Sequence, residues 1–145
     1  MADSLSDSEP PYGAIALRMA YNVNKPVPRG GGRTIAIVGA FAHPTPDQSV
    51  NAYRANYGLP TTTIAQYNQD GGPLMNVSYN PNWGLGQMKA LEMVSAMCPL
   101  CPLIYVGAKN NTYADLAAGV RFAQTVADVV AIGWGLPEDA SSPVA

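Results

Sequence analysis

Short, wholly apolar segments recur along the chain, and longer segments with the pattern of helices lie between them. The apolar segments are Thr34–Ala40, Leu103–Ala108 and Val129–Gly133. They lack the apolar–polar alternation of a strand with one solvated face, so each predicts a strand buried on both faces. Helix patterns occupy residues 14–21, 46–57, 83–97 and 112–125. This alternation predicts an α/β fold with a parallel sheet, helices on both faces and right-handed crossovers.

The sequence also predicts a tail, a linker and weaker strands around these segments. Residues 1–13 are acidic and polar and predict a flexible tail, while 14–145 has the length of one domain. Thr61–Tyr67 and Met75–Tyr79 have weaker strand patterns around a DGGP turn at 70–73. The glycines at 30–32 precede a strand and not a helix. They therefore predict a linker and not a phosphate-binding loop.

Composition excludes several classes of function. The 8 basic residues are scattered and the net charge is −2, so no basic surface for nucleic acid is expected. The longest apolar run, Leu103–Ala108, is far shorter than the roughly 20 residues of a membrane span. The polar N-terminus is unlike a secretory signal. No motif indicates a cofactor or a resident metal, since the only histidine, His43, cannot complete a four-ligand zinc site.

Two cysteines form a Cys-x-x-Cys pair, Cys98 and Cys101. Such a pair can be structural or disulfide-bonded, half of a metal site that a partner completes, or a redox pair. A redox pair of the thioredoxin kind precedes a helix, whose N-terminus lowers the thiol pKa. This pair follows a helix and precedes a strand. We therefore favour structural or disulfide-bonded cysteines, with the metal and redox interpretations kept as alternatives.

Four segments, in order, resemble the sedolisin family of serine-carboxyl peptidases. They are IAIVGAFAHPTPDQSVNAYRANYGLP (35–60), WGLGQMKALEMVSAMCPLCPLIYVGA (83–108), NNTYADLAAGVRFA (110–123) and VVAIGWGLPE (129–138). With ALRMAYNV (16–23) they span nearly the whole chain after residue 13. The resemblance implies the N-terminal half of a subtilisin-like catalytic domain. It also implies a secreted, extracellular location, although the chain contains no signal peptide.

The resemblance places the family's catalytic carboxylates at substituted positions. The family uses a serine nucleophile, a glutamate base and an aspartate that orients the base four residues along the same helix. The matching residues are Gly86 and Ala90, which carry no proton. Glu92 lies two residues beyond Ala90, about 200° around the helix, and Gln87 is not a base. The family's serine, oxyanion aspartate and calcium site lie beyond the matched segments. The resemblance therefore implies a chain without catalytic residues, which is not an enzyme.

The helix that holds these positions is expected to pack into the core. Apolar residues recur along it at every third position and predict its buried face: Leu85, Met88, Leu91, Val94 and Met97.

A peptide-binding feature is also implied. Gly133, Trp134 and Gly135 match the strand end that in subtilisin-like folds offers its backbone to an extended peptide, although the family pattern has serine at position 133. Trp134 can equally be a core or rim aromatic with a satisfied N–H group. His43 is interpreted as structural or solvent-exposed.

The function expected from these features is that of a catalytically inactive sedolisin-like module, acting as a structural or protein-interaction subunit. The family's sheet continues beyond the segment resembling Val129–Gly133, and only 12% of the residues are charged. We therefore expect a protein partner or a homo-oligomer to cover the open sheet, and an extended peptide as a further ligand. The alternatives are one chain of a split or processed serine-carboxyl peptidase, and a Cys-x-x-Cys metal or redox protein.

Overall fold

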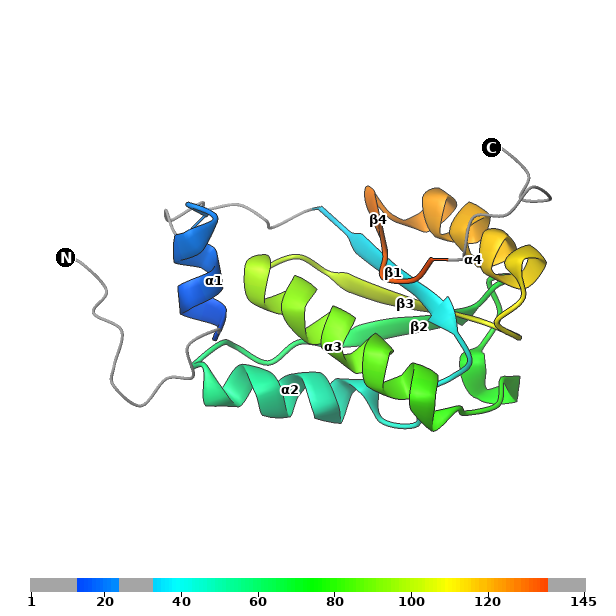
Figure 1. Cartoon of the computed structure of the whole chain (residues 1–145), viewed down its shortest axis with the longest axis horizontal. Coiled ribbons are helices and arrows are strands. Elements are labelled where there is room, and N and C mark those ends of the chain that lie inside the picture. Colours follow the sequence, from blue (N-terminus) through cyan, green and yellow to red (C-terminus); the bar gives the residue numbers. More distant parts are fainter. Residues whose placement is uncertain (1–12, 24–32, 136–145) are drawn as a thin grey trace.

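The computed structural model describes residues 13–23 and 33–135. Its centre is a four-stranded parallel sheet with strand order β2-β3-β1-β4 (Figure 1). The strands are β1 (Ile35–Ala40), β2 (Ile64–Asn68), β3 (Leu103–Ala108) and β4 (Val129–Ile132). The predicted α/β fold with a parallel sheet is thus confirmed. Apart from Gly13, the predicted tail lies outside the described residues, as do the glycines at 30–32.

Alternate residues of the strands build two cores, one on each face of the sheet. On one face, Ile37, Leu103 and Tyr105 pack with Val50, Met88 and Leu91. On the other, Val38, Ile104 and Val106 pack with Ala123. Because both faces are covered, the inner strands β1 and β3 can be apolar throughout, as the sequence indicated.

The helices divide between these faces. α2 (Pro46–Asn56) and α3 (Pro81–Met97) lie side by side on the first face, and α1 (Ala14–Ala20) packs against α3 (Figure 1). α4 (Tyr113–Val126) covers the second face, in contact with β1, β3 and β4. None of the helices in the described ranges is long and apolar enough to cross a membrane.

α3 begins two residues earlier than its apolar pattern indicated. The Asn80 side chain accepts hydrogen bonds from the backbone N–H groups of Asn82 and Trp83, and Pro81 occupies the first helical turn. Asparagine as the cap followed by proline is a favourable helix start, because it satisfies N–H groups that have no partner within the helix.

Three sequence predictions were wrong. β4 is not buried on both faces, because it is the last strand of the described sheet and its Val129 and Ile132 are 51% and 49% exposed. Residues 75–79 do not form a strand: Leu74–Asn76 is a single turn of 3-10 helix, and only Tyr79 bridges to Ala42. Leu85 is not in the core, since its side chain is 73% exposed. A three-residue step turns a helix by about 300°, so a strict repeat of three drifts off the buried face. The buried positions of α3 follow the true helical period and include Gln87, Met88, Leu91 and Ser95.

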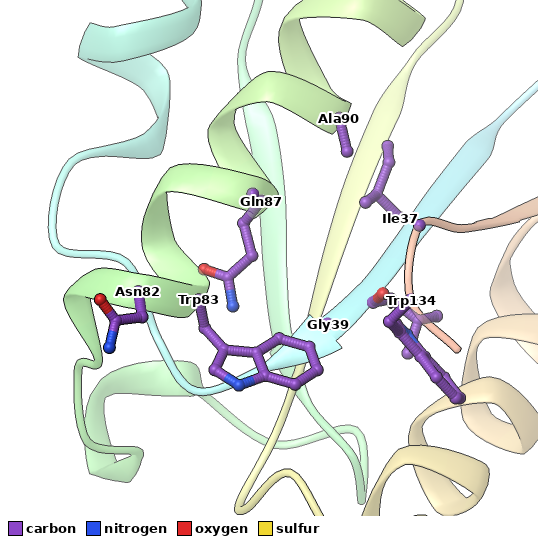
Figure 2. A pocket seen from close by; sticks show the side chains of 10 residues that line it. Ile37, Gly39, Asn82, Trp83, Gln87, Ala90 and Trp134 are labelled. Atoms are coloured by element: carbon purple, nitrogen blue, oxygen red, sulfur yellow. Dashed lines mark hydrogen bonds between the residues drawn. The ribbon is translucent and has the colours of Figure 1, made fainter. Parts of the chain in front are cut away.

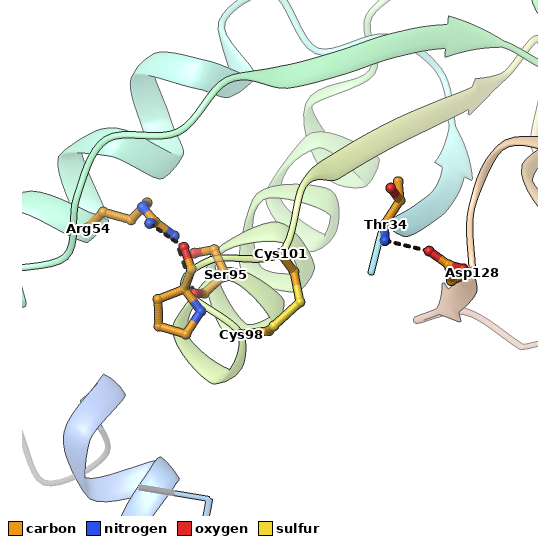
Figure 3. The surroundings of a disulfide bond; sticks show 7 residues. Thr34, Arg54, Ser95, Cys98, Cys101 and Asp128 are labelled. Atoms are coloured by element: carbon orange, nitrogen blue, oxygen red, sulfur yellow. Dashed lines mark hydrogen bonds between the residues drawn. A yellow bond between two sulfur atoms is a disulfide. The ribbon is translucent and has the colours of Figure 1, made fainter. Parts of the chain in front are cut away.

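A buried arginine joins the ends of α2 and α3. Arg54 is only 1% exposed and donates hydrogen bonds to the backbone carbonyls of Pro60, Ser95 and Pro99. Pro99 lies inside the short loop that the Cys98–Cys101 disulfide closes (Figure 3). The guanidinium therefore holds three segments together through carbonyl groups alone.

Candidate functional site

A hollow of about 210 Å³ lies on the α3 face of the sheet, at the carboxyl ends of β1 and β4 (Figure 2). Its floor is the end of β1, one side is α3, and the other side is the segment that follows β4. The lining residues are Ile37, Val38, Gly39, Asn82, Trp83, Gly86, Gln87, Ala90, Gly133 and Trp134. Ligands of open α/β sheets commonly bind at the carboxyl ends of the strands, so this hollow is the candidate site.

The two positions that match the family's carboxylates both line the hollow. Gly86 and Ala90 are four residues apart on α3 and therefore share one face of the helix. Among the described residues that line the hollow, none carries a side chain that titrates in the acidic to neutral pH range. Glu92 is not among the lining residues, and partial burial raises the pKa of its carboxyl group. Residues 13–23 and 33–135 therefore contribute no candidate general base to the lining of the hollow.

Buried polar groups hold the end of β1 beneath the hollow. The Gln87 side-chain amide donates to the carbonyl of Ala40, and the Tyr105 hydroxyl donates to the carbonyl of Phe41 at 2.8 Å. Burial strongly raises the pKa of Tyr105, so its hydroxyl stays a neutral donor. These bonds hold Phe41 in a left-handed conformation with φ of 69°. The end of β1 is thus fixed by its neighbours.

Trp134 is fixed from the other side. Its indole N–H donates to the carbonyl of Val38 at 2.9 Å, and Val38 belongs to the last β1–β4 pair, with Ile132. The ring also packs against the cluster of Ala40, Ala108 and Leu116. The N–H group is therefore satisfied within the chain. Gly133 and Gly135, on either side of Trp134, are exposed.

The remaining candidate residues lie apart from the hollow. The His43 ring packs edge-on against Tyr79, its Nδ1 accepts from the Thr45 backbone N–H, and partial burial lowers its pKa. Cys98 and Cys101 are joined in a disulfide, so neither sulfur is the thiolate that binds metals. In residues 13–23 and 33–135, no three His, Cys, Asp or Glu side chains gather as metal ligands.

Trp83 is the aromatic lining residue that sequence reasoning did not single out. It lies in the first turn of α3. Its ring packs edge-on against the Phe41 ring, with 6.3 Å between the ring centroids. It reaches the hollow that Trp134 lines from the other side (Figure 2). The two tryptophans are 51 residues apart, so no local pattern relates them.

No protein-family model and no curated protein matches this chain. The sedolisin resemblance accordingly stays a prediction, carried by the segments quoted above. Fold and site define a broader class: an α/β module with a parallel sheet and, at the carboxyl ends of its strands, a hollow that is largely apolar in the part of the chain that the structure describes.

Gly84 and Gly86 of α3 differ in the space around them, and substitution of each by alanine tests this difference. A Cβ added at Gly86 meets nothing within 4 Å, whereas one at Gly84 lies 2.8 Å from Cε2 of Tyr79. Gly86→Ala should therefore raise the free energy of unfolding by about 0.5–1 kcal/mol, because alanine restricts the unfolded chain and favours helix. Gly84→Ala should raise it less, because the Tyr79 ring must move to make room for the new methyl group. Urea unfolding of both variants checks the pair, and equal shifts of the same sign would contradict this geometry.

Proposed function

We propose that this chain is a catalytically inactive, sedolisin-like module that acts as a structural or protein-interaction subunit. The observation that carries the proposal is the α3 side of the hollow. Where the resemblance expects a glutamate base and its aspartate partner, Gly86 and Ala90 line a hollow whose described lining side chains are all uncharged. Proton transfer needs a group of suitable pKa within hydrogen-bonding reach of the nucleophile, and none of the described lining side chains provides one.

The edge of the sheet supports the interaction role. In the described part of the chain, β4 is paired on one side only, with β1. Val129 and Ile132 on this strand are 51% and 49% exposed. An exposed apolar edge strand is a template for pairing with another chain. We infer that a partner protein, a second copy or an extended peptide adds to this edge, beside Gly133–Gly135.

Peptidase assays test the catalytic part of the proposal. The purified protein should cleave neither casein nor a peptide library at acid or neutral pH. The double variant Gly86→Glu with Ala90→Asp should remain inactive, because it restores the carboxylates without a nucleophile. Turnover by the unmodified protein would overturn the proposal. Turnover only after mixing with a second chain would favour one half of a split peptidase.

Light scattering tests the association. We expect a stable homo-oligomer or a permanent complex that buries at least about 1,200 Å². Replacing Ile132 by lysine should shift the equilibrium toward the monomer, because charge on an edge strand opposes pairing. The matched change Leu85→Lys on α3 lies away from this edge and should leave the assembly unchanged. A protein that stays monomeric over a wide concentration range would contradict the interaction role.

A further inference from the structure

The only two cysteines of the chain, Cys98 and Cys101, form a disulfide where α3 ends and the segment leading to β3 begins (Figure 3). Cys98 is the C-cap of the helix. The backbone N–H of Cys101 donates to the carbonyl of Cys98 at 3.1 Å, so a hydrogen-bonded turn also holds the two residues together. Because this turn does not require the S–S bond, the two thiols would stay close after reduction, and the disulfide can form again.

The same turn carries an acceptor of the buried arginine. Pro99, between the cysteines, accepts a hydrogen bond from Nη2 of Arg54 at 2.8 Å. Nη1 of Arg54 donates to the carbonyl of Ser95 in the last turn of α3 at 3.3 Å, and Nε donates to the carbonyl of Pro60 in the loop after α2. Arg54 itself lies in the last turn of α2. The disulfide thus helps to fix one of the three carbonyls through which Arg54 holds the ends of α2 and α3 together.

The disulfide is more accessible at one of its two cysteines. Cys98 is half-buried and Leu100 in the turn is 59% exposed, whereas Cys101 is only 6% exposed. An external thiolate therefore attacks Sγ of Cys98: its sulfur bonds to Cys98, the S–S bond breaks, and Cys101 leaves as a thiolate that takes up a proton. With a dithiol, the second thiol displaces Cys98 in the same way. The products are two protein thiols and the cyclic, oxidised reagent, so the exchange is balanced and reversible.

From this arrangement we propose that the Cys98–Cys101 disulfide is a redox switch on the Arg54 contact. In the oxidised chain the closed turn holds the Pro99 carbonyl against the guanidinium. Opening of the disulfide by a thiol frees the turn, weakens that hydrogen bond and loosens the end of α3 from the end of α2. The inference does not depend on the proposed function, since this turn lies at the opposite end of α3 from the hollow.

Two features favour a switch over a crosslink that only stabilises the chain. The cysteines are three residues apart, so their disulfide restrains the unfolded chain less than a long-range disulfide does. The contact with Arg54 is buried, so a weakened hydrogen bond there has a real cost to the folded chain. Coupling between two sites is reciprocal. Loss of the Arg54 hydrogen bonds must therefore ease reduction by the same factor by which reduction weakens the hold of Arg54.

The equilibrium between the folded protein and dithiothreitol tests that coupling, with the thiols trapped by alkylation and counted by mass spectrometry. Arg54→Lys keeps the charge but not the fork of donors. It should raise the equilibrium constant for reduction about 2–10-fold, the range expected for one hydrogen bond. Arg121→Lys, at an exposed arginine of α4, is the matched control and should leave the constant unchanged. Thermal unfolding establishes that each variant is folded. An equal constant in Arg54→Lys and the wild type would overturn the switch.

Hydrogen exchange of the wild-type chain tests the structural effect without any variant. The Cys101 amide donates to the Cys98 carbonyl, and the Leu59 amide donates to the Arg54 carbonyl at the end of α2. Both amides should exchange about 3-fold or more faster after reduction, whereas the amides of α4 should be unchanged. Cys98→Ser with Cys101→Ser should show the reduced pattern with or without dithiothreitol. No change on reduction, faster exchange confined to residues 98–101, or the oxidised pattern in the double variant would each overturn the inference.

Discussion

Replacing Arg54 by alanine should lower the free energy of unfolding by about 3 kcal/mol or more. Arg54 is 1% exposed and donates to the carbonyls of Pro60, Ser95 and Pro99. Figure 3 shows Arg54 beside Ser95 at the end of α3. Each buried acceptor left without a donor costs about 1–3 kcal/mol, and truncation to alanine also leaves a cavity. The loss should appear as a lower midpoint of urea unfolding, with the slope unchanged if the unfolded state is unaffected.

Two comparisons identify the cause of that loss. Arg54→Lys keeps the charge but lacks the planar fork that reaches several acceptors, so it should recover only part of the stability. Arg121→Ala removes an exposed arginine from α4 and should change stability by no more than about 0.5 kcal/mol. A loss below about 1 kcal/mol for Arg54→Ala would mean that water replaces the guanidinium at these carbonyls.

The strands show why the fold was readable from the sequence. β1 and β3 are the inner strands and are covered on both faces, so their sequences are apolar throughout and their bounds were predicted closely. Residues 75–79 were mistaken for a strand because alternating apolar residues are also compatible with an irregular segment. Propensity could not show that only Tyr79 finds a strand partner, Ala42.

The candidate site was only partly predictable. Helical geometry places Gly86 and Ala90 on one face, and the structure brings both to the hollow with Gly133 and Trp134. Trp83 and Arg54 were missed for different reasons. Trp83 is brought to the hollow by tertiary packing against Phe41. The hydrogen-bond acceptors of Arg54 are backbone carbonyls, which every residue type possesses. Neither contact leaves a signal in the amino-acid sequence.

Gly107→Ala should be the other strongly destabilising change, because two main-chain segments approach each other at this residue. A Cβ at Gly107, in β3, would lie 2.5 Å from the carbonyl oxygen of Phe41 and 2.6 Å from Cδ1 of Leu74. Overpacking typically costs about 1–3 kcal/mol, and we expect the upper end of that range. The leucine side chain can rotate away. The Phe41 carbonyl cannot move freely, because it accepts the hydrogen bond of the Tyr105 hydroxyl.

A double-mutant cycle separates the two clashes. Leu74→Ala removes the side-chain obstacle, so Gly107→Ala in that background should cost less than in the wild type, but the conflict with the Phe41 carbonyl should persist. Gly86→Ala is the matched glycine-to-alanine control with open space around the new methyl group. Phe41 follows the strand that forms the floor of the hollow, so the same substitution should also alter tryptophan emission. Wild-type stability in Gly107→Ala would mean that β1 and its following turn do not approach β3 this closely.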